Sequence, residues 1–408
     1  MKSSPSVLRE SLNWFLLASF FFMHYFVRIS PSLIDVQLMK TFSITIKHIG
    51  WISSFYFITY TASQIPVGYL MKFYSSRFLI GSASLACGVC ALAFTYATAF
   101  PTALLSLLCY AFFGAFGFVG AISYATKKIP QYASLFVGMT QSMGMAGGFI
   151  ATNLITAQIQ HHSWQSVIGQ FPIALFMIGL AIFLIVPSDA QPSSESVNQG
   201  AAKPTVNIYC NSQTWFNALY AGCIYYPLMV LTEGGLGVSL LESIHHLGRE
   251  QIAFAVSMVF IGWLIGGPFA GLVADKYGHR RVMLASSICG LLTIIPAIFL
   301  PLSSNMLSIC LFTFGITNTG IVGCYSLAAS MHGPENSSIS VAIANMSTIL
   351  IGSILGGILP MLLETHCNAT FIDGIPYYQG ADYQLIFGSA MIIALILSYV
   401  LGALVKTR

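Results

Sequence analysis

The chain has 408 residues, of which 56% are hydrophobic and only 7% are charged, and its formal net charge is +4. Soluble domains carry about 25% charged residues, so these side chains cannot cover a water-facing surface. The composition therefore excludes a soluble domain, and the small positive charge does not indicate a nucleic-acid partner.

Apolar runs with the length of a bilayer-spanning helix recur along the whole chain, separated by Gly, Pro and charged residues. They predict an all-α polytopic membrane protein with twelve transmembrane helices in two six-helix bundles. The first run is too long for a cleavable signal segment. The predicted spans are residues 12–36, 47–70, 78–98, 102–126, 132–156, 167–187, 214–240, 250–273, 281–300, 304–330, 337–363 and 383–405.

A polar segment separates the sixth span from the seventh. Residues 188–207 are rich in Ser, Gln and Pro, which is typical of a flexible linker. We therefore expect an N-terminal bundle at 1–187, a cytoplasmic linker at 188–213 and a C-terminal bundle at 214–408. With both termini cytoplasmic, twelve of the placed Lys and Arg residues fall on the cytoplasmic side and three on the other, which follows the positive-inside rule.

The two halves are related in sequence at a constant offset of 203 residues. Because six helices bring the chain back to the side where it started, the halves are parallel repeats. Two such bundles are expected to rock around a central site. The offset places Gly68 on Gly271, Arg77 on Arg280, Gly117 on Gly320, Gly120 on Gly323 and Met143 on Met346.

The loop between the predicted eighth and ninth spans reads GLVADKYGHRR, residues 271–281. It resembles the G-x-x-x-D-R/K-x-G-R-R cytoplasmic loop of the major facilitator superfamily, and the chain resembles that family over essentially its whole length. Gly271 is expected to permit close helix contact and Gly278 to form the turn. Asp275 with Arg280 and Arg281 would form a charge lock at the cytoplasmic gate. The alternative is that the basic residues only anchor the loop inside.

Two further resemblances concern the substrate. HYFVR at residues 24–28 is similar to the first helix of organophosphate:phosphate antiporters, in which such an arginine holds the anionic group. The repeat-related position carries Leu231, so a clamp of two arginines is not expected. SSFYF at residues 53–57 and GMAGG at residues 144–148 resemble the phagosomal amino-acid transporters of intracellular bacteria, which implies the bacterial inner membrane.

In the first-half copy of the gate loop, Lys72 stands where the family has Asp.

Arg28 is the clearest charged residue inside a predicted span, where a charge costs about 2.5–3.5 kcal/mol on insertion scales. Its guanidinium can hold a carboxylate through two parallel hydrogen bonds. His24 and Tyr25 precede it on the same helix face. The alternative is an arginine that snorkels to the outer interface.

Glu233 lies two residues from the repeat equivalent of Arg28, so the two should face one cavity at similar depth. Tyr226 precedes Glu233 by seven residues, which is two helical turns on the same face. Glu233 could bind a substrate ammonium, carry the coupling proton, or form a static ion pair with Arg28.

Polar residues in other spans are expected to converge on the same cavity. Ser53, Tyr56, Tyr60 and Gln64 form a polar stripe at helical spacing. Each amide alone is more often a helix–helix hydrogen bond than a ligand. The full predicted substrate-binding set is Arg28, His24, Tyr25, Tyr56, Tyr60, Gln64, Gln141, Tyr226, Glu233, Asn318 and Asn345.

The sequence offers little for enzymatic, metal or cofactor chemistry. The Cys87–Cys90 pair lies in a predicted span without further ligands, and the His pairs at 161–162 and 245–246 lack companions at ligand spacing. No nucleophile–base pair stands out, so we expect no enzyme, no metal and no cofactor. No G-x-x-x-x-G-K-[ST] loop occurs, so ATP is not expected to drive transport directly.

The sequence thus predicts a monomeric secondary active transporter in contact with membrane lipid. Its substrate would be a small zwitterionic or anionic solute, with an amino acid favoured, and uptake would be coupled to H+. The alternatives are an exchanger or exporter of another organic anion, such as a sugar acid, an organophosphate or a siderophore-like compound, and a non-transporting receptor on the same scaffold.

Overall fold

The computed structural model describes residues 7–44, 46–188, 208–233, 237–367, 370–372 and 375–406. Most of the predicted linker, residues 189–207, lies outside this part of the chain. The first half is helical throughout. Its helices are α1 (Val7–Leu33), α2 (Asp35–Phe42), α3 (Ile46–Phe73), α4 (Ser76–Thr95), α5 (Phe100–Lys128), α6 (Ala133–Gln158), α7 (Trp164–Ile168) and α8 (Phe171–Ile185).

The second half adds helices whose regular winding is interrupted at three places: a π-helix at Met229–Glu233, a 3-10 turn at Asn318–Gly320 and a second π-helix at Gln384–Gly388. Its α-helices are α10 (Ser212–Leu228), α11 (Gly237–His245), α12 (Arg249–Tyr277), α13 (His279–Phe299), α14 (Ser304–Thr317), α15 (Ile321–Met331), α16 (Ser337–His366), α17 (Gly380–Tyr383) and α18 (Ser389–Leu404). Two short antiparallel strands, β1 (Thr370–Ile372) and β2 (Ile375–Tyr377), form a hairpin that the sequence did not predict.

Within the described residues, nine helical segments are long and apolar enough to cross a membrane, or ten if α10 and α11 are counted as one broken span. Helices α3 and α6 complete the twelve predicted spans. Both are 26 residues or longer, but Ser, Thr, Tyr, Gln and Gly lower their hydropathy. Both helices contact the opposite half of the molecule.

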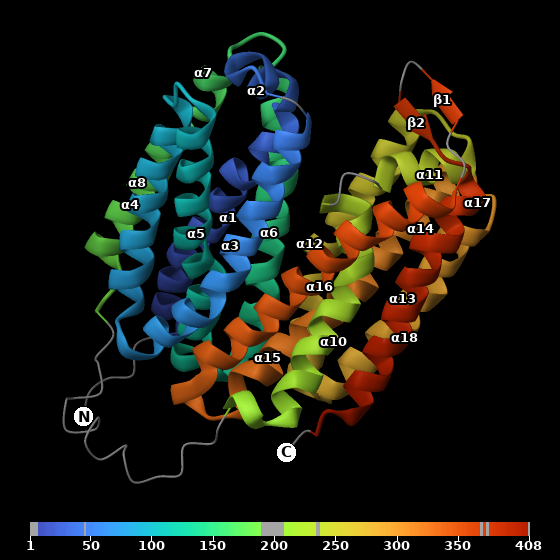
Figure 1. The fold of residues 1–408 in the computed structure, drawn as a ribbon. Helices are drawn as coiled ribbons and strands as arrows, with labels where there is room; N and C mark the ends of the chain where they lie inside the picture. Colours follow the sequence, from blue (N-terminus) through green and yellow to red (C-terminus); the bar gives the residue numbers. More distant parts are fainter. Residues whose placement is uncertain are drawn as a thin grey trace, which may run out of the picture.

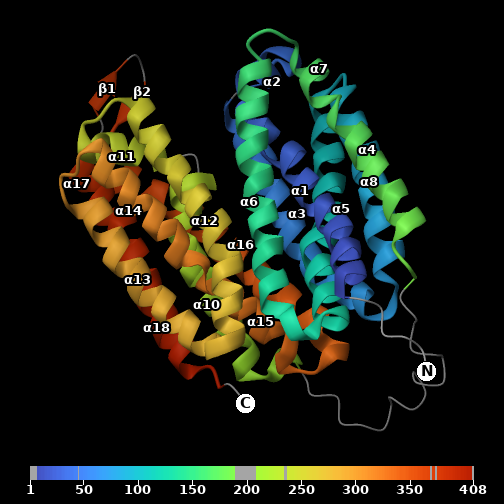
Figure 2. The same ribbon diagram turned by 180° about the vertical axis from the view of Figure 1, so that it is seen from behind.

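The helices form two groups, α1–α8 and α10–α18, seen side by side in Figure 1 and from behind in Figure 2. In both views the groups meet at the end of the molecule where α1 begins and α18 ends, which we call the terminal end. They splay apart at the opposite, distal end. The molecule is therefore closed toward the terminal end.

Two helix pairs make the most extensive contacts between the halves, and we call them the α3/α16 seam and the α6/α12 seam. Glycines permit both. A Cβ on Gly68 of α3 would lie 2.7 Å from Ala342 Cβ of α16, and a Cβ on Gly271 of α12 would lie 2.7 Å from Leu135 Cα of α6. Gly68 and Gly271 are the pair related by the repeat, so the sequence repeat corresponds to a repeated close contact.

Candidate functional site

A central space lies between the two halves, walled by α1, α3, α5 and α6 on one side and by α10, α15 and α16 on the other. Its free volume is about 20 Å³, enough for about one water molecule. A solute therefore requires its walls to move apart. The lining residues are Phe21, Tyr25, Arg28, Tyr60, Phe118, Gln141, Tyr225, Tyr325, Asn345, Thr348 and Ile349.

Arg28 lies in the wall of this space, surrounded by aromatic rings. Its guanidinium carbon is 4.7 Å from the ring centroid of Tyr25, 5.3 Å from that of Phe57 and 5.5 Å from that of Tyr60. Cation–π contacts stabilise an exposed guanidinium by about 0.5–1 kcal/mol and a desolvated one by about 2 kcal/mol, and Arg28 is half-buried. Arg28 lines the space between the halves together with two of these rings, those of Tyr25 and Tyr60.

His24 and Tyr56 lie beside the central space and do not line it. His24 Nε2 and Tyr56 Oη are 2.8 Å apart, both side chains are buried, and the His24 ring stacks on Tyr110 with centroids 5.0 Å apart. The ring also packs over Gly114, where a Cβ would lie 2.8 Å from His24 Cε1. These contacts tie α1, α3 and α5 together, so both residues pack the interior of the first half.

The predicted amides have three different placements. Gln141 and Asn345 line the space, whereas Gln64 is fully buried beside it and accepts a hydrogen bond from Asn345 Nδ2 at 3.0 Å. Asn318 lies inside the second half, where its Nδ2 donates to Ile224 O at 2.7 Å and its Oδ1 accepts from Trp263 Nε1 at 3.2 Å. Asn318 therefore holds α10 and α12 to the 3-10 turn, away from the space.

The side chains of Glu233 and Ser53 lie outside the described part of the structure. Tyr226 is buried and does not line the space, but its neighbour Tyr225 does. The predicted face relating Tyr226 to Glu233 assumed 3.6 residues per turn. The π-helix Met229–Glu233 begins three residues after Tyr226 and ends at Glu233, so it changes the helical phase between the two.

Six lining residues were missed by the sequence analysis: Phe21, Phe118, Tyr225, Tyr325, Thr348 and Ile349. Phe21 could have been found, because Phe21, Tyr25 and Arg28 follow at i, i+4 and i+7 on one face. The others are aromatic, apolar or hydroxyl side chains within apolar spans, and nothing in their local pattern separates a cavity wall from a helix contact.

Comparison with known proteins identifies the family. A sequence model of the Major Facilitator Superfamily matches residues 14–357 and 228–408. The chain belongs to the major facilitator superfamily. Its structure is similar to that of the transporter FucP of the same superfamily in the outward conformation, with a TM-score of 0.74 and 14% identity over 98% of this chain and 100% of that one. A variant of the E. coli fucose:proton symporter FucP matches with a TM-score of 0.69, 14% identity and coverage of 98% and 99%.

Two curated relatives match part of the chain. The MFS-type transporter YuxJ of Bacillus subtilis is 28% identical over 141 residues, which is 33% of this chain and 36% of YuxJ. The sialic acid transporter NanX of Escherichia coli is 32% identical over 130 residues, which is 31% of this chain and 32% of NanX. The match thus spans about a third of the length of each relative. This chain is a polytopic membrane protein of that superfamily.

The superfamily loop at residues 271–281 lies at the terminal end. Gly278 has φ = 95°, which allows the sharp turn between α12 and α13. Arg280 donates to the Ala403 carbonyl of α18 in its own half, and Asp275 is exposed. Within the described residues no ion pair joins Asp275 to these arginines, so the predicted charge lock is not formed in this arrangement. At the corresponding first-half loop, Lys72 Nζ donates to Asn336 Oδ1 of the other half at 2.9 Å.

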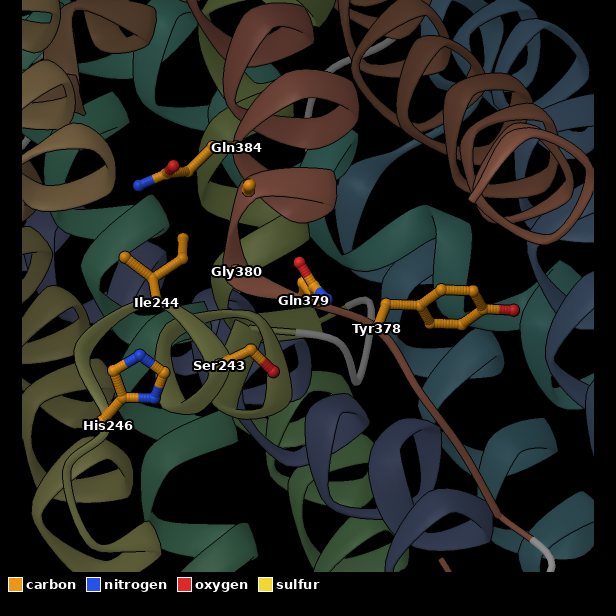
Figure 3. A pocket seen from close by; sticks show the side chains of 8 residues that line it. Ser243, Ile244, His246, Tyr378, Gln379, Gly380 and Gln384 are labelled. Atoms are coloured by element: carbon orange, nitrogen blue, oxygen red, sulfur yellow. The ribbon is translucent and has the colours of Figure 1, made fainter. Parts of the chain in front are cut away.

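A larger pocket of about 500 Å³ opens at the distal end of the second half (Figure 3). Ser243, Ile244 and His246 border it from α11 and the loop that follows, opposite Gln379 and Gln384. All of its lining residues belong to one half, so it is not on the path between the halves. Among the described residues, no group of three or more His, Cys, Asp or Glu side chains could hold a metal ion.

Proposed function

We propose that this protein is a secondary active transporter that carries a small organic carboxylate through the central space by alternating access. The observation that carries the proposal is the position of Arg28, a permanent charge in the wall between the halves and among three aromatic rings. A charge at this depth is costly and is retained where it serves a solute pathway. A guanidinium matches a carboxylate through two parallel hydrogen bonds.

The remaining lining suits the rest of an organic acid. Gln141, Asn345, Tyr325 and Thr348 offer amide and hydroxyl groups, and the six other lining residues besides Arg28 are aromatic or aliphatic. None of the described lining residues is acidic. This chemistry fits a carboxylate that also carries hydroxyl or amide groups, as a sugar acid does. The partial match to a sialic acid transporter supports that class.

An amino acid is the second candidate, because the π-helix Met229–Glu233 ends at an acidic residue. π-Helical segments are rare and often lie at functional sites. Glu233 would then bind the substrate ammonium or carry the coupling proton. In either case the proposed driving force is an H+ gradient. The sequence contains no phosphate-binding loop of the G-x-x-x-x-G-K-[ST] type.

The terminal end would face the cytoplasm, as the distribution of Lys and Arg predicts for the bacterial inner membrane. The units that rock would be the bundles at residues 1–187 and 214–408, connected by the linker at 188–213. The structure is closed toward the terminal end and would thus represent a state that receives solute from outside. The glycine contacts of the two seams are those that would separate when the cytoplasmic side opens.

Uptake into proteoliposomes tests the function. Purified protein is reconstituted and supplied with labelled sialic acid, leucine or fucose, with and without an imposed pH gradient. The expected result is gradient-dependent uptake of a carboxylate and no uptake of uncharged fucose. Arg28→Ala should abolish it. Uptake of fucose alone, or carboxylate uptake that survives Arg28→Ala, would reject the organic-acid assignment.

A further inference from the structure

Asn345 both lines the central space and forms a hydrogen bond between the two halves. It lines the central space from α16, and its Nδ2 donates to Gln64 Oε1 of α3, in the other half, at 3.0 Å. Its Oδ1 accepts from Tyr325 Oη at 3.2 Å, which also lines the space. Gln64 itself is fully buried and is not part of the lining. A solute in the space can therefore reach one partner of this inter-half hydrogen bond but not the other.

The bond lies at the inner end of the α3/α16 seam. Asn345 is about 12 Å along α16 from its first residue at the terminal end. Closer to that end, Ser338 Oγ donates to Gly68 O at 2.8 Å and Lys72 Nζ donates to Asn336 Oδ1. The Asn345–Gln64 bond is thus the one that adjoins the central space, and it must break when the terminal end opens.

Breaking this bond in a dry interior leaves both amides short of a partner. Each unsatisfied buried group costs about 1–3 kcal/mol. A bound carboxylate or hydroxyl oxygen can accept the Asn345 N–H in place of Gln64. The solute then replaces one hydrogen bond with another, while Gln64 is left to water that enters as the seam opens.

The second seam provides an internal comparison. At the offset of 203 residues, Asn345 corresponds to Ser142 and Gln64 corresponds to Gly267. Ser142 Oγ donates at 3.0 Å to Leu264 O of α12, a carbonyl that lacks its usual helical donor because Pro268 stands four residues later. Ser142 is not among the residues that line the central space. Both seams therefore have a hydrogen bond at this position, but of the two only the one at Asn345 adjoins the central space.

We infer that Asn345 is the residue through which bound solute opens the terminal end: the solute takes the Asn345 amide from Gln64 and so releases the α3/α16 seam. The inference rests on the proposed function and assigns Gln64 to the inter-half bond rather than to substrate. It also makes the two seams unequal, since the α6/α12 seam responds to the solute only through the movement of the first.

Affinity measurements separate this role from ordinary packing. Full-length protein in lipid nanodiscs is titrated with sialic acid and with leucine by calorimetry. Gln64→Leu should bind the accepted ligand more tightly than wild type, because Asn345 no longer has to leave a competing partner. Asn345→Leu should bind it about tenfold more weakly, the change produced by losing one hydrogen bond of about 1.4 kcal/mol. Ser142→Ala, the matched control, should keep the wild-type affinity.

Hydrogen–deuterium exchange tests, without ligand, whether the Asn345–Gln64 bond holds the α3/α16 seam closed. Gln64→Leu should raise exchange in the terminal halves of α3 and α16 about tenfold, and ligand should raise it little further. Ser142→Ala should retain the full response to ligand. Gln64→Met, which keeps the chain length, replaces the leucine variant if that one does not fold.

The inference would be overturned if Gln64→Leu bound ligand more weakly than wild type. It would also be overturned if ligand raised hydrogen–deuterium exchange in Gln64→Leu as much as in Ser142→Ala. If neither ligand binds wild type, the organic-acid assignment fails on its own. Exchange in ligand-free Gln64→Leu then tests whether the Asn345–Gln64 bond holds the seam closed. Exchange at the wild-type level would reject that role.

Discussion

Gly138 provides a direct test of how the halves close. It lies on α6 in the α6/α12 seam, where a Cβ would be 2.6 Å from the Gly267 carbonyl carbon and closer still to its oxygen. Both are backbone atoms, so no side-chain rotation can relieve the overlap. Gly138→Ala therefore requires α12 to retreat by roughly 1 Å, as in an overpacked interface.

The expected change in the ratio of open to closed molecules depends on the cost of overpacking. Overpacking of this kind costs about 1–3 kcal/mol, and it acts only while the seam is closed. The gain of about 0.5–1 kcal/mol from Ala in a helix is present in both the closed and open arrangements and cancels between them. The ratio of open to closed molecules at the terminal end should therefore rise by about 5- to 150-fold.

Hydrogen–deuterium exchange of full-length protein in nanodiscs measures this change in the segments 134–146 and 262–272. Gly356→Ala is the matched control, because it makes the same change in a helix at a site where a Cβ would meet nothing within 4 Å. Size exclusion and melting temperature check that both variants fold. Equal exchange in the two variants would refute the idea that glycine contact at this seam limits opening.

The other predictions concern charge, protons and the gate loop. Arg28→Ala should weaken carboxylate binding by well over tenfold, from the ~2–5 kcal/mol of a truncated charge pair, and spare an uncharged analogue; similar affinities in Arg28→Lys, Arg28→Ala and wild type would remove Arg28 from the site. Glu233→Gln should preserve exchange of internal for external substrate but flatten the pH dependence of net uptake in proteoliposomes, and an unchanged pH profile would place the proton elsewhere. Asp275→Asn should change labelling of the terminal end from each side of the membrane more than it changes affinity, and the reverse pattern would assign Asp275 to binding. Gly278→Ala should lower the melting temperature relative to Gly356→Ala, because a side chain at φ = 95° stores about 1–3 kcal/mol of strain; equal melting temperatures would contradict this.

The fold class can be predicted from the amino-acid sequence, because the physics behind it is local. A segment of about 20 apolar residues can satisfy its backbone in lipid only as a helix, wherever its neighbours lie. The offset of 203 residues also placed Gly68 and Gly271 at equivalent positions, and the structure has a close helix contact at each. Arg28 was conspicuous for the same local reason, since a charge inside an apolar run is costly whatever surrounds it.

Which polar residues share a space, and which pair with each other, depends on how the helices pack. Five polar residues in apolar spans look alike in the sequence: His24, Tyr56, Gln64, Gln141 and Asn318. Of these five, only Gln141 lines the space, whereas the other four form hydrogen bonds within the protein. The local sequence around Gln64 does not reveal that its partner is Asn345, which lies 281 residues further along the chain. The π-helix that ends at Glu233 likewise shifts the helical phase, because winding responds to packing between helices as well as to the residues themselves.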